Sequence, residues 1–269
     1  MSTTEQDEAA EAPRDQVRQD GEPEVRQIYD PVADTPTRYR RDPAEAHPPL
    51  DYAPYKSTQL RHPKQPLIYL PHTVTEITGP QLSGAVRLAD TDNDLTAQHQ
   101  GAPIGERIIV SGHVYDTEGK PLRNTLVEIW QANAAGRYAH KWDRWAAPLD
   151  PNFKGAGRCE TDSDGRYEFT TIRPGPYPWG NHYNAWRPAH IHFSVLGRAF
   201  TQRLVTQMYF PGDPFFPYDP IFNSVRDEQA RARMISTFNI HETRPNWAQA
   251  FNWDIYLRGP AATPFEEAF

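Results

Sequence analysis

The chain of 269 residues carries 35 acidic and 28 basic side chains, a net charge of −7 and a single cysteine, Cys159. One cysteine excludes an internal disulfide framework and a cysteine-based metal cluster, and the lack of a basic block argues against nucleic acid as a partner. No apolar run approaches the roughly 20 residues that a membrane helix needs, and the acidic N-terminus lacks the apolar core of a secretory signal. We therefore expect a cytoplasmic protein with neither a membrane nor a nucleic acid as partner.

Composition divides the chain into three parts. Residues 1–45 are polar and charged, with too little apolar surface to offset the entropy of ordering, so we expect a largely disordered or extended tail. Residues 46–103 are rich in aromatic residues and proline, as in Tyr52–Tyr55. We expect this arm to pack on the main domain or on a partner subunit, and residues 104–269 to form the main domain.

Short strands dominate the main domain. A β-branched run predicts a strand over 107–115, followed by a turn at 118–120 and a returning strand over 125–131. A second hairpin turn is expected at 162–165, and further strands are expected over 166–172, 190–195, 204–210 and 252–257.

The only helical composition lies near 227–236, where Ser224 and Asp227 have the spacing of a capping box. Repeated short strands with turn signals predict an all-β fold, a β-sandwich of mixed short strands with long Pro-rich loops.

His190 and His192 are the first candidate site residues. Alternate side chains of a strand point to the same face, so both imidazoles lie on one side while Ile191 and Phe193 lie on the other. Two such imidazoles can bind one metal ion. They can equally be polar residues on the solvated face of an edge strand, and cupins and zinc hydrolases use the same spacing.

Two tyrosines could complete such a site. Tyr177 stands between Pro176 and Pro178, which restrict the backbone on both sides and hold the phenol in place. A phenolate is a hard anionic donor that suits Fe(III), although a packed aromatic residue is the commoner role of tyrosine. Tyr138 follows a strand and a glycine-containing turn, and by itself it cannot be distinguished from a core or surface tyrosine. The acidic pair Glu266–Glu267 is expected to be solvated.

Several stretches together resemble the intradiol ring-cleaving dioxygenases. They are residues 101–110, 124–138, 147–153, 175–179 (Gly-Pro-Tyr-Pro-Trp) and 186–193 (Trp-Arg-Pro-Ala-His-Ile-His-Phe). The resemblance covers the chain from about residue 50 to the C-terminus. No single stretch is specific, but their combination is.

The resemblance implies a non-haem Fe(III) centre with a hydroxide as fifth ligand. Its protein ligands would be Tyr138 and His190 in the equatorial plane and Tyr177 and His192 in axial positions. A catechol would bind as a dianion and displace Tyr177, and O₂ would then break the ring between the two hydroxyl-bearing carbons.

The same resemblance implies roles for further residues. Arg187 would stabilise negative charge on the ring, although it could instead be a structural ion-pair partner, and Gln207 would lie on the oxygen-binding side. The residues expected to contact substrate are Trp130, Trp179, Ile221 and, at the substrate carboxylate, Tyr55.

The lack of a helical N-terminal domain favours the protocatechuate branch of the family. This branch implies conversion of protocatechuate and O₂ to 3-carboxy-cis,cis-muconate, a step of aromatic catabolism in the β-ketoadipate pathway. It also implies a homologous α subunit that forms α/β pairs in a larger oligomer. Three alternatives stay open: an enzyme for another catechol such as hydroxyquinol, a non-catalytic β-sandwich binding subunit, and a cupin-like metalloenzyme.

Overall fold

The computed structural model describes residues 42–43, 45–65, 88–116, 118–196 and 203–266. The chain divides into two units, and nearly all the described residues belong to the unit formed by Arg38–Pro63 and His72–Phe269. This unit is the one described below. Most of the predicted tail, residues 1–45, lies outside the described residues, and so does Glu267. Within the described ranges, no helix is both long and apolar enough to cross a membrane.

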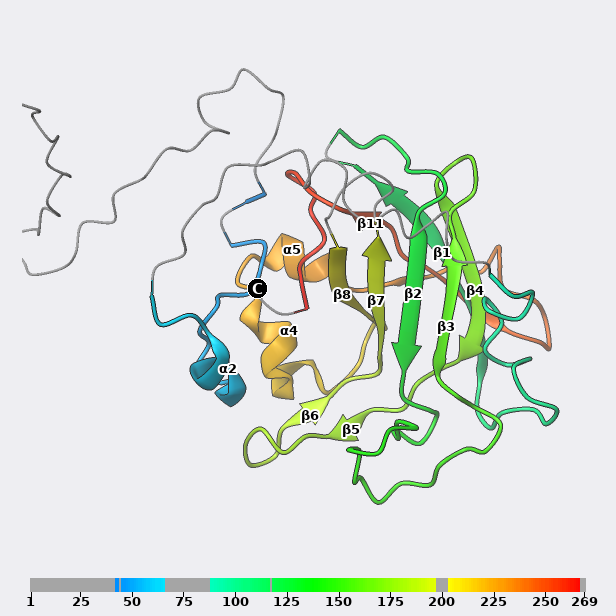
Figure 1. The fold of residues 1–269 in the computed structure, drawn as a ribbon, viewed down its shortest axis with the longest axis horizontal. Helices are drawn as coiled ribbons and strands as arrows, with labels where there is room; N and C mark the ends of the chain where they lie inside the picture. Colours follow the sequence, from blue (N-terminus) through cyan, green and yellow to red (C-terminus); the bar gives the residue numbers. More distant parts are fainter. Residues whose placement is uncertain (1–41, 44, 66–87, 117, 197–202, 267–269) are drawn as a thin grey trace, which may run out of the picture. The chain divides into compact units, whose positions relative to one another are not determined.

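Strands make up most of the regular structure, which confirms the predicted all-β class. They are β1 Arg107–Tyr115, β2 Leu126–Gln131, β3 Ala156–Glu160, β4 Arg166–Ile172, β5 Tyr177–Pro178, β6 Trp186–Arg187, β7 His190–Leu196, β8 Arg203–Tyr209, β9 Thr237–Phe238, β10 Gln249–Asn252 and β11 Ile255–Tyr256. One sheet has the order β11-β1-β10-β9 with β4 also paired to β1, a second has the order β3-β2-β7-β8, and β5 pairs with β6 (Figure 1). The first sheet is mixed, because β1 runs parallel to β10 and β11 but antiparallel to β4.

A single apolar core lies between the two large sheets. Ile108 and Phe169 enter it from β1 and β4, while Ile129 and Phe193 enter it from β2 and β7, and each is at most 2% exposed. Leu95, which precedes the strands, is fully buried in the same core. Because alternate residues of a strand share a face, this core leaves the opposite face of β7 available for polar side chains.

Both predicted turns are present, but the predicted hairpin pairing is wrong. The backbone N–H of Asp116 donates to the carbonyl of Lys120, and that of Gly165 donates to the carbonyl of Asp162. However, β1 pairs with β4, whereas β2 pairs with β3 and β7. Each turn therefore carries the chain from one sheet to the other, because turn residues fix a reversal of the backbone but not the sheet that the next strand joins.

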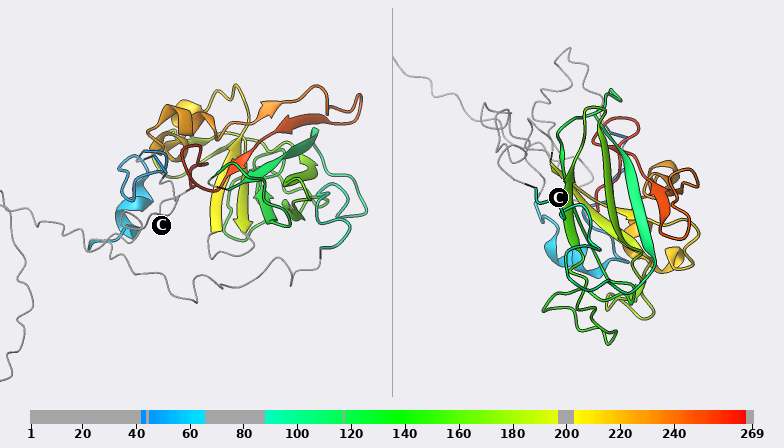
Figure 2. Two further views of the ribbon diagram at one scale, coloured as in Figure 1. Left: turned by 90° about the horizontal axis from the view of Figure 1, so that it is seen from above. Right: turned by 90° about the vertical axis from the view of Figure 1, so that its right-hand side faces the viewer.

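Short helices are more numerous than the sequence predicted. They are α2 Lys56–Arg61, the 3₁₀ helix η1 Phe216–Tyr218, α4 Pro220–Ser224 and α5 Glu228–Ala232. The predicted capping box is wrong: Asp227 alone caps α5 by accepting from the N–H of Gln229, while the Ser224 hydroxyl donates to the carbonyl of Ile221 in α4. The α-helices α2, α4 and α5 lie on the β8 side of the four-stranded sheet in Figure 1, and the left view of Figure 2 shows them at the same end.

A second apolar cluster joins these helices to the sheet. Tyr209 at the end of β8 packs with Phe222 of α4 and Ala230 of α5, and Ala46 from the predicted arm is buried among them. The arm also bonds to its own chain at α2, where the N–H of Lys56 donates to the Asn181 side chain. The described part of the arm thus packs on the main domain. The predicted packing against a partner subunit stays a prediction.

Candidate metal centre

Strand pairing brings the candidate site residues together. The two residues of β5 pair with β6 so that Tyr177 stands opposite Arg187. In the adjacent four-stranded sheet, His192 of β7 stands between Trp130 of β2 and Gln207 of β8. These registers place Tyr177 beside Arg187, and they place Trp130, His192 and Gln207 side by side although the latter three span 77 positions of the printed sequence.

Two glycines allow the loop that carries Tyr138 to reach the site. Gly136 has a φ of +76°, and a Cβ atom there would lie 2.3 Å from the carbonyl oxygen of Pro176. Gly175 is equally confined, because its Cβ would lie 2.4 Å from the carbonyl oxygen of Ala134. Only glycine permits such close contact of the two backbones. The two loops therefore fit against each other and bring Tyr138 beside Tyr177.

The four predicted metal ligands converge on one point. The Tyr138 hydroxyl lies 3.1 Å from Nε2 of His192 and 3.5 Å from Nε2 of His190, and the Tyr177 hydroxyl lies 3.4 Å from Nε2 of His190. His190 and His192 are 2% and 7% exposed, so neither is the solvated edge residue that the sequence left open. Two phenol oxygens and two imidazole nitrogens thus face one another in a largely buried cluster.

The other ring nitrogen of each histidine has a fixed partner. Nδ1 of His190 lies 2.6 Å from the carbonyl oxygen of Pro188, and Nδ1 of His192 lies 2.8 Å from Oε2 of Glu266. A carbonyl oxygen and a carboxylate can only accept, so each Nδ1 carries the proton and each Nε2 presents a lone pair to the cluster. The expectation that Glu266 is solvated is wrong, because the C-terminal segment folds back onto β8 and places its side chain against His192.

Burial sets the charge of the cluster. It raises the pKa of Tyr138 well above its usual value, with a further contribution from Tyr177, and it raises the pKa of Tyr177 although Arg187 opposes the change. Burial, Arg187 and His192 together lower the pKa of His190 well below its usual value. The phenols and this imidazole are therefore neutral at pH 7. An added cation is what would draw the protons from the phenols.

The donor set fits a hard cation. Among the described residues, no group of three or more His, Cys, Asp or Glu side chains could hold a metal ion, and the side-chain oxygens that face the two imidazoles are those of Tyr138 and Tyr177. Phenolate oxygen with imidazole suits a trivalent ion such as Fe(III) better than the softer ions that prefer thiolates. The residues present thus fit the predicted ferric centre.

Arg187 lies beside the cluster in a buried polar network. Its Nε donates to Oδ2 of Asp219 at 3.2 Å, its Nη2 donates to Oε1 of Gln207, and the Tyr209 hydroxyl donates to the same Oε1 at 2.8 Å. Burial alone would lower the pKa of Arg187, but Asp219 and the neighbouring tyrosines outweigh it and raise the pKa well above its usual value. Arg187 is therefore a permanently charged ion-pair partner of Asp219. Its predicted contact with a substrate ring stays a prediction.

The residues predicted to contact substrate surround this cluster. The Trp130 ring stacks on His192 with centroids 4.8 Å apart and an angle of 7° between the planes. Trp179 packs edge-on against Tyr55 at 5.0 Å, and the Arg187 guanidinium lies 5.7 Å from the centre of the Trp179 ring. Ile221 is buried in α4, where its N–H donates to Oδ1 of Asp219. Trp130 thus packs on a candidate ligand, and Trp179 contacts both Tyr55 and Arg187, but the substrate contacts of these residues stay predictions.

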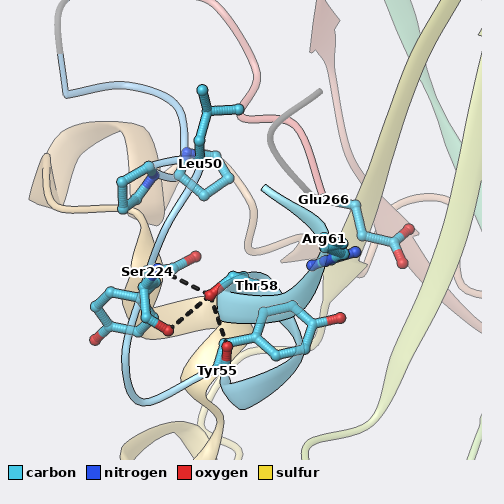
Figure 3. A pocket seen from close by; sticks show the side chains of 9 residues that line it. Leu50, Tyr55, Thr58, Arg61, Ser224 and Glu266 are labelled. Atoms are coloured by element: carbon cyan, nitrogen blue, oxygen red, sulfur yellow. Dashed lines mark hydrogen bonds between the residues drawn. The ribbon is translucent and has the colours of Figure 1, made fainter. Parts of the chain in front are cut away.

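A small pocket lies between the arm and the C-terminal segment. Tyr55, Thr58 and Arg61 of the arm line it together with Ser224 and Glu266 (Figure 3). The Thr58 hydroxyl donates to the carbonyl of Tyr55 at 2.7 Å, a bond that closes the start of α2. The carboxylate that bonds to His192 thus also borders the arm.

Sequence reasoning missed two residues of the site, Glu266 and Asp219. Asp219 precedes Pro220 at the start of α4, and an Asp-Pro pair at a helix start is a recognisable N-cap signal. That signal identifies a cap but gives no indication of Arg187 as a second partner. Glu266 offers no local signal at all, because only the folded chain brings it to His192.

Comparison with known proteins agrees with this geometry. Residues 77–259 match the family model described as Dioxygenase, and residues 39–73 match that of the protocatechuate 3,4-dioxygenase beta subunit N terminal. The chain is 54% identical to a protocatechuate 3,4-dioxygenase beta chain from Burkholderia cepacia, over 88% of this chain and 98% of that relative. The chain therefore belongs to the intradiol ring-cleaving dioxygenase family.

The chain is also similar to more distant proteins. The chain is 27% identical to a protocatechuate 3,4-dioxygenase alpha chain from Pseudomonas putida, over 74% of this chain and 98% of that relative. Among solved structures, the dioxygenase domain of a carbohydrate-binding fusion protein from Streptomyces sp. SirexAA-E matches with 26% identity and a TM-score of 0.45, over 62% of this chain and 87% of that one. Membership of the dioxygenase family excludes the cupin-like alternative.

Proposed function

We propose that this chain is the iron-binding β subunit of a protocatechuate 3,4-dioxygenase. The reaction would join protocatechuate and O₂ to give 3-carboxy-cis,cis-muconate, with both oxygen atoms entering the product and no external reductant consumed. The observation that carries the proposal is the convergence of two phenols and two Nε2 lone pairs. The 54% identity to a beta chain of that name supports the choice of substrate.

Tyr138, Tyr177, His190 and His192 would hold one non-haem Fe(III). When bound, this ion would supply a Lewis-acid centre that draws electron density from a catechol ring and makes the ring reactive toward O₂. The chain's own contribution is to present the four donors already oriented. Fixed Nδ1–H groups keep both imidazoles in the ligating tautomer, since the partner of each Nδ1 can only accept.

Other residues would bind the substrate and move its protons. Tyr177 belongs to a pair of two-residue strands, β5 and β6, outside the two large sheets. Once it is deprotonated to the phenolate, its oxygen would accept one of the two catechol protons as the substrate binds. Arg187, held by Asp219 and Gln207, would face negative charge that develops on the ring. Trp130 and Trp179 would exclude water from the substrate ring.

The working enzyme would pair this chain with a homologous α subunit in a larger oligomer. Support comes from the resemblance to proteins named beta chain and alpha chain of the same enzyme. Light scattering of the chain expressed alone and together with an α subunit tests this proposal. A fully active, monodisperse protein from the single chain would refute it.

The visible absorption spectrum and the iron content of the protein purified with its α partner test the function directly. We expect about one iron per chain with this donor set, a broad red-brown phenolate-to-Fe(III) band, and a change in that band when protocatechuate is added without oxygen. Turnover should be highest on protocatechuate when it is compared with catechol and hydroxyquinol. A colourless protein that still contains iron would exclude phenolate ligation, and a preference for hydroxyquinol would move the enzyme to another branch.

A further inference from the structure

The side chain of Glu266 is placed unusually for a residue near a chain end. Its Oε2 lies 2.8 Å from Nδ1 of His192, and the two side chains are only 14% and 9% exposed. Glu266 is separated from His192 by 74 positions, so the contact depends on the fold of the whole domain. A carboxylate so well shielded from water needs a strong hydrogen-bond partner to be retained there.

Two backbone hydrogen bonds anchor the C-terminal segment next to this contact. The backbone N–H of Glu266 donates to the carbonyl of Val205 on β8, 2.8 Å away. The N–H of the preceding Phe265 donates to Nδ1 of His47 at 3.2 Å, and the two rings pack with centroids 4.6 Å apart. Since β8 pairs directly with β7, these bonds fix the position of the Glu266 carboxylate along the strands, beside His192. The side chain is therefore positioned by backbone bonds and not only by its own charge.

The two histidines of the cluster differ in this respect. His190 donates its Nδ1 proton to a neutral backbone carbonyl two residues earlier, that of Pro188. His192 donates its proton to a carboxylate, and a charged acceptor makes the imidazole a stronger electron donor at Nε2 than a neutral acceptor does. Nε2 of His192 is thus the stronger electron donor of the two, and Nε2 of His190 is the weaker.

We infer that Glu266 is a positioning residue of the metal centre, which fixes the tautomer of His192 and strengthens Nε2 as a ligand. The inference rests on the proposed iron site, because it concerns a ligand of that site. Glu266 contacts neither the metal nor the substrate in this role. It acts through His192, and its side chain also borders the pocket that Tyr55 and Arg61 line (Figure 3).

Three variants of the protein, each purified with its α partner, test the inference. E266A removes the acceptor, E266Q keeps an acceptor of the same shape without the charge, and E228Q is the control because the Glu228 side chain is 89% exposed. Iron affinity is measured by competition with a chelator, and the wavelength of the phenolate-to-Fe(III) band is recorded on loaded protein. Circular dichroism and thermal unfolding identify any variant that has lost its fold, and the isosteric E266Q then carries the test.

We expect E266A to lose ~10–100-fold in iron affinity and E266Q to lose less, as removal of an outer partner of a ligating histidine usually does. Both should move the phenolate band to longer wavelength, because a weaker imidazole donor leaves the iron more electron-poor, while E228Q should match the wild type. A folded E266Q and E266A with wild-type affinity and band would overturn the inference but leave the iron site intact. Wild-type protein that binds no iron would overturn the proposed function and this inference with it.

Discussion

The central strands of the two sheets carry similar side chains with different consequences. On β1, Ser111 and His113 lie on the face opposite Ile108 and Val110, just as His190 and His192 lie opposite Ile191 and Phe193 on β7. The Ser111 hydroxyl has a structural role, since it donates to Glu242 at 2.7 Å and accepts from Asn252 at 2.9 Å. On β7, Nδ1 of each histidine is held by a carbonyl or a carboxylate, while Nε2 of each faces the tyrosine hydroxyls. A polar strand face becomes a site when the fold directs one polar atom of each side chain to a common point.

The largest expected effect follows from removing Nε2 of His192 on β7. H192A should lower iron affinity by more than the ~100-fold limit of outer-partner changes, because it deletes a ligand itself. The matched control is H113A on β1, where Nδ1 lies 3.4 Å from Asp254 and the ring stacks on Tyr115. Iron content after dialysis against a chelator distinguishes the two. Normal iron in H192A would remove this residue from the ligand set.

The next effect concerns buried charge. Arg187 and Asp219 are 4% and 0% exposed, so D219N leaves the guanidinium buried without its counter-charge. We expect a loss of about 3–5 kcal/mol in the free energy of unfolding, measured by urea denaturation. The comparison is E168Q on β4, which breaks an ion pair to Arg166 whose side chains are 32% and 37% exposed and should cost at most about 1 kcal/mol. Equal losses in the two variants would contradict the assigned burial.

The sequence predicts the strands and the candidate ligands of this molecule better than it predicts their long-range partners. The β7 strand follows from the alternation of polar and apolar residues, which also makes His190 and His192 a candidate ligand pair on one face. The flanking prolines make Tyr177 a further candidate, but the set of four ligands is implied only by the resemblance to the dioxygenase family. The partners Asp219 and Glu266 do not follow from such patterns, because they lie 32 and 74 positions from the residues they hold. The turns after β1 and β3 are equally readable, yet the sheet that each following strand joins is decided by long-range pairing, which the turn residues do not encode.

A smaller effect is expected on β1. S111A removes a fully buried hydroxyl that bridges Glu242 and Asn252, but Glu242 is partly exposed and can turn to water. We expect a loss of about 1 kcal/mol in the free energy of unfolding, the usual net value of one hydrogen bond. Iron content and turnover per folded protein should not change, since the bridge lies in the five-stranded sheet. A fall in iron content would mean that the two sheets are coupled more tightly than their hydrogen bonds indicate.

The smallest effect is a pH dependence at the junction of the sheets. Asp92 accepts from the N–H of Ala89 and from Nε of Arg158 on β3, both contacts lower its pKa below the usual 3.8, and part of it is exposed. A carboxyl whose pKa is lower in the folded state binds fewer protons there, so its stabilisation is complete above pH 3.8 and is lost as the pH falls through the folded value. D92N should therefore be less stable than wild type near neutral pH, by under ~1 kcal/mol for so exposed a pair. The gap, measured by urea denaturation at a series of pH values, should close below pH 3.8. A gap that stays constant into acid would show that Asp92 acts through its shape and not through its charge.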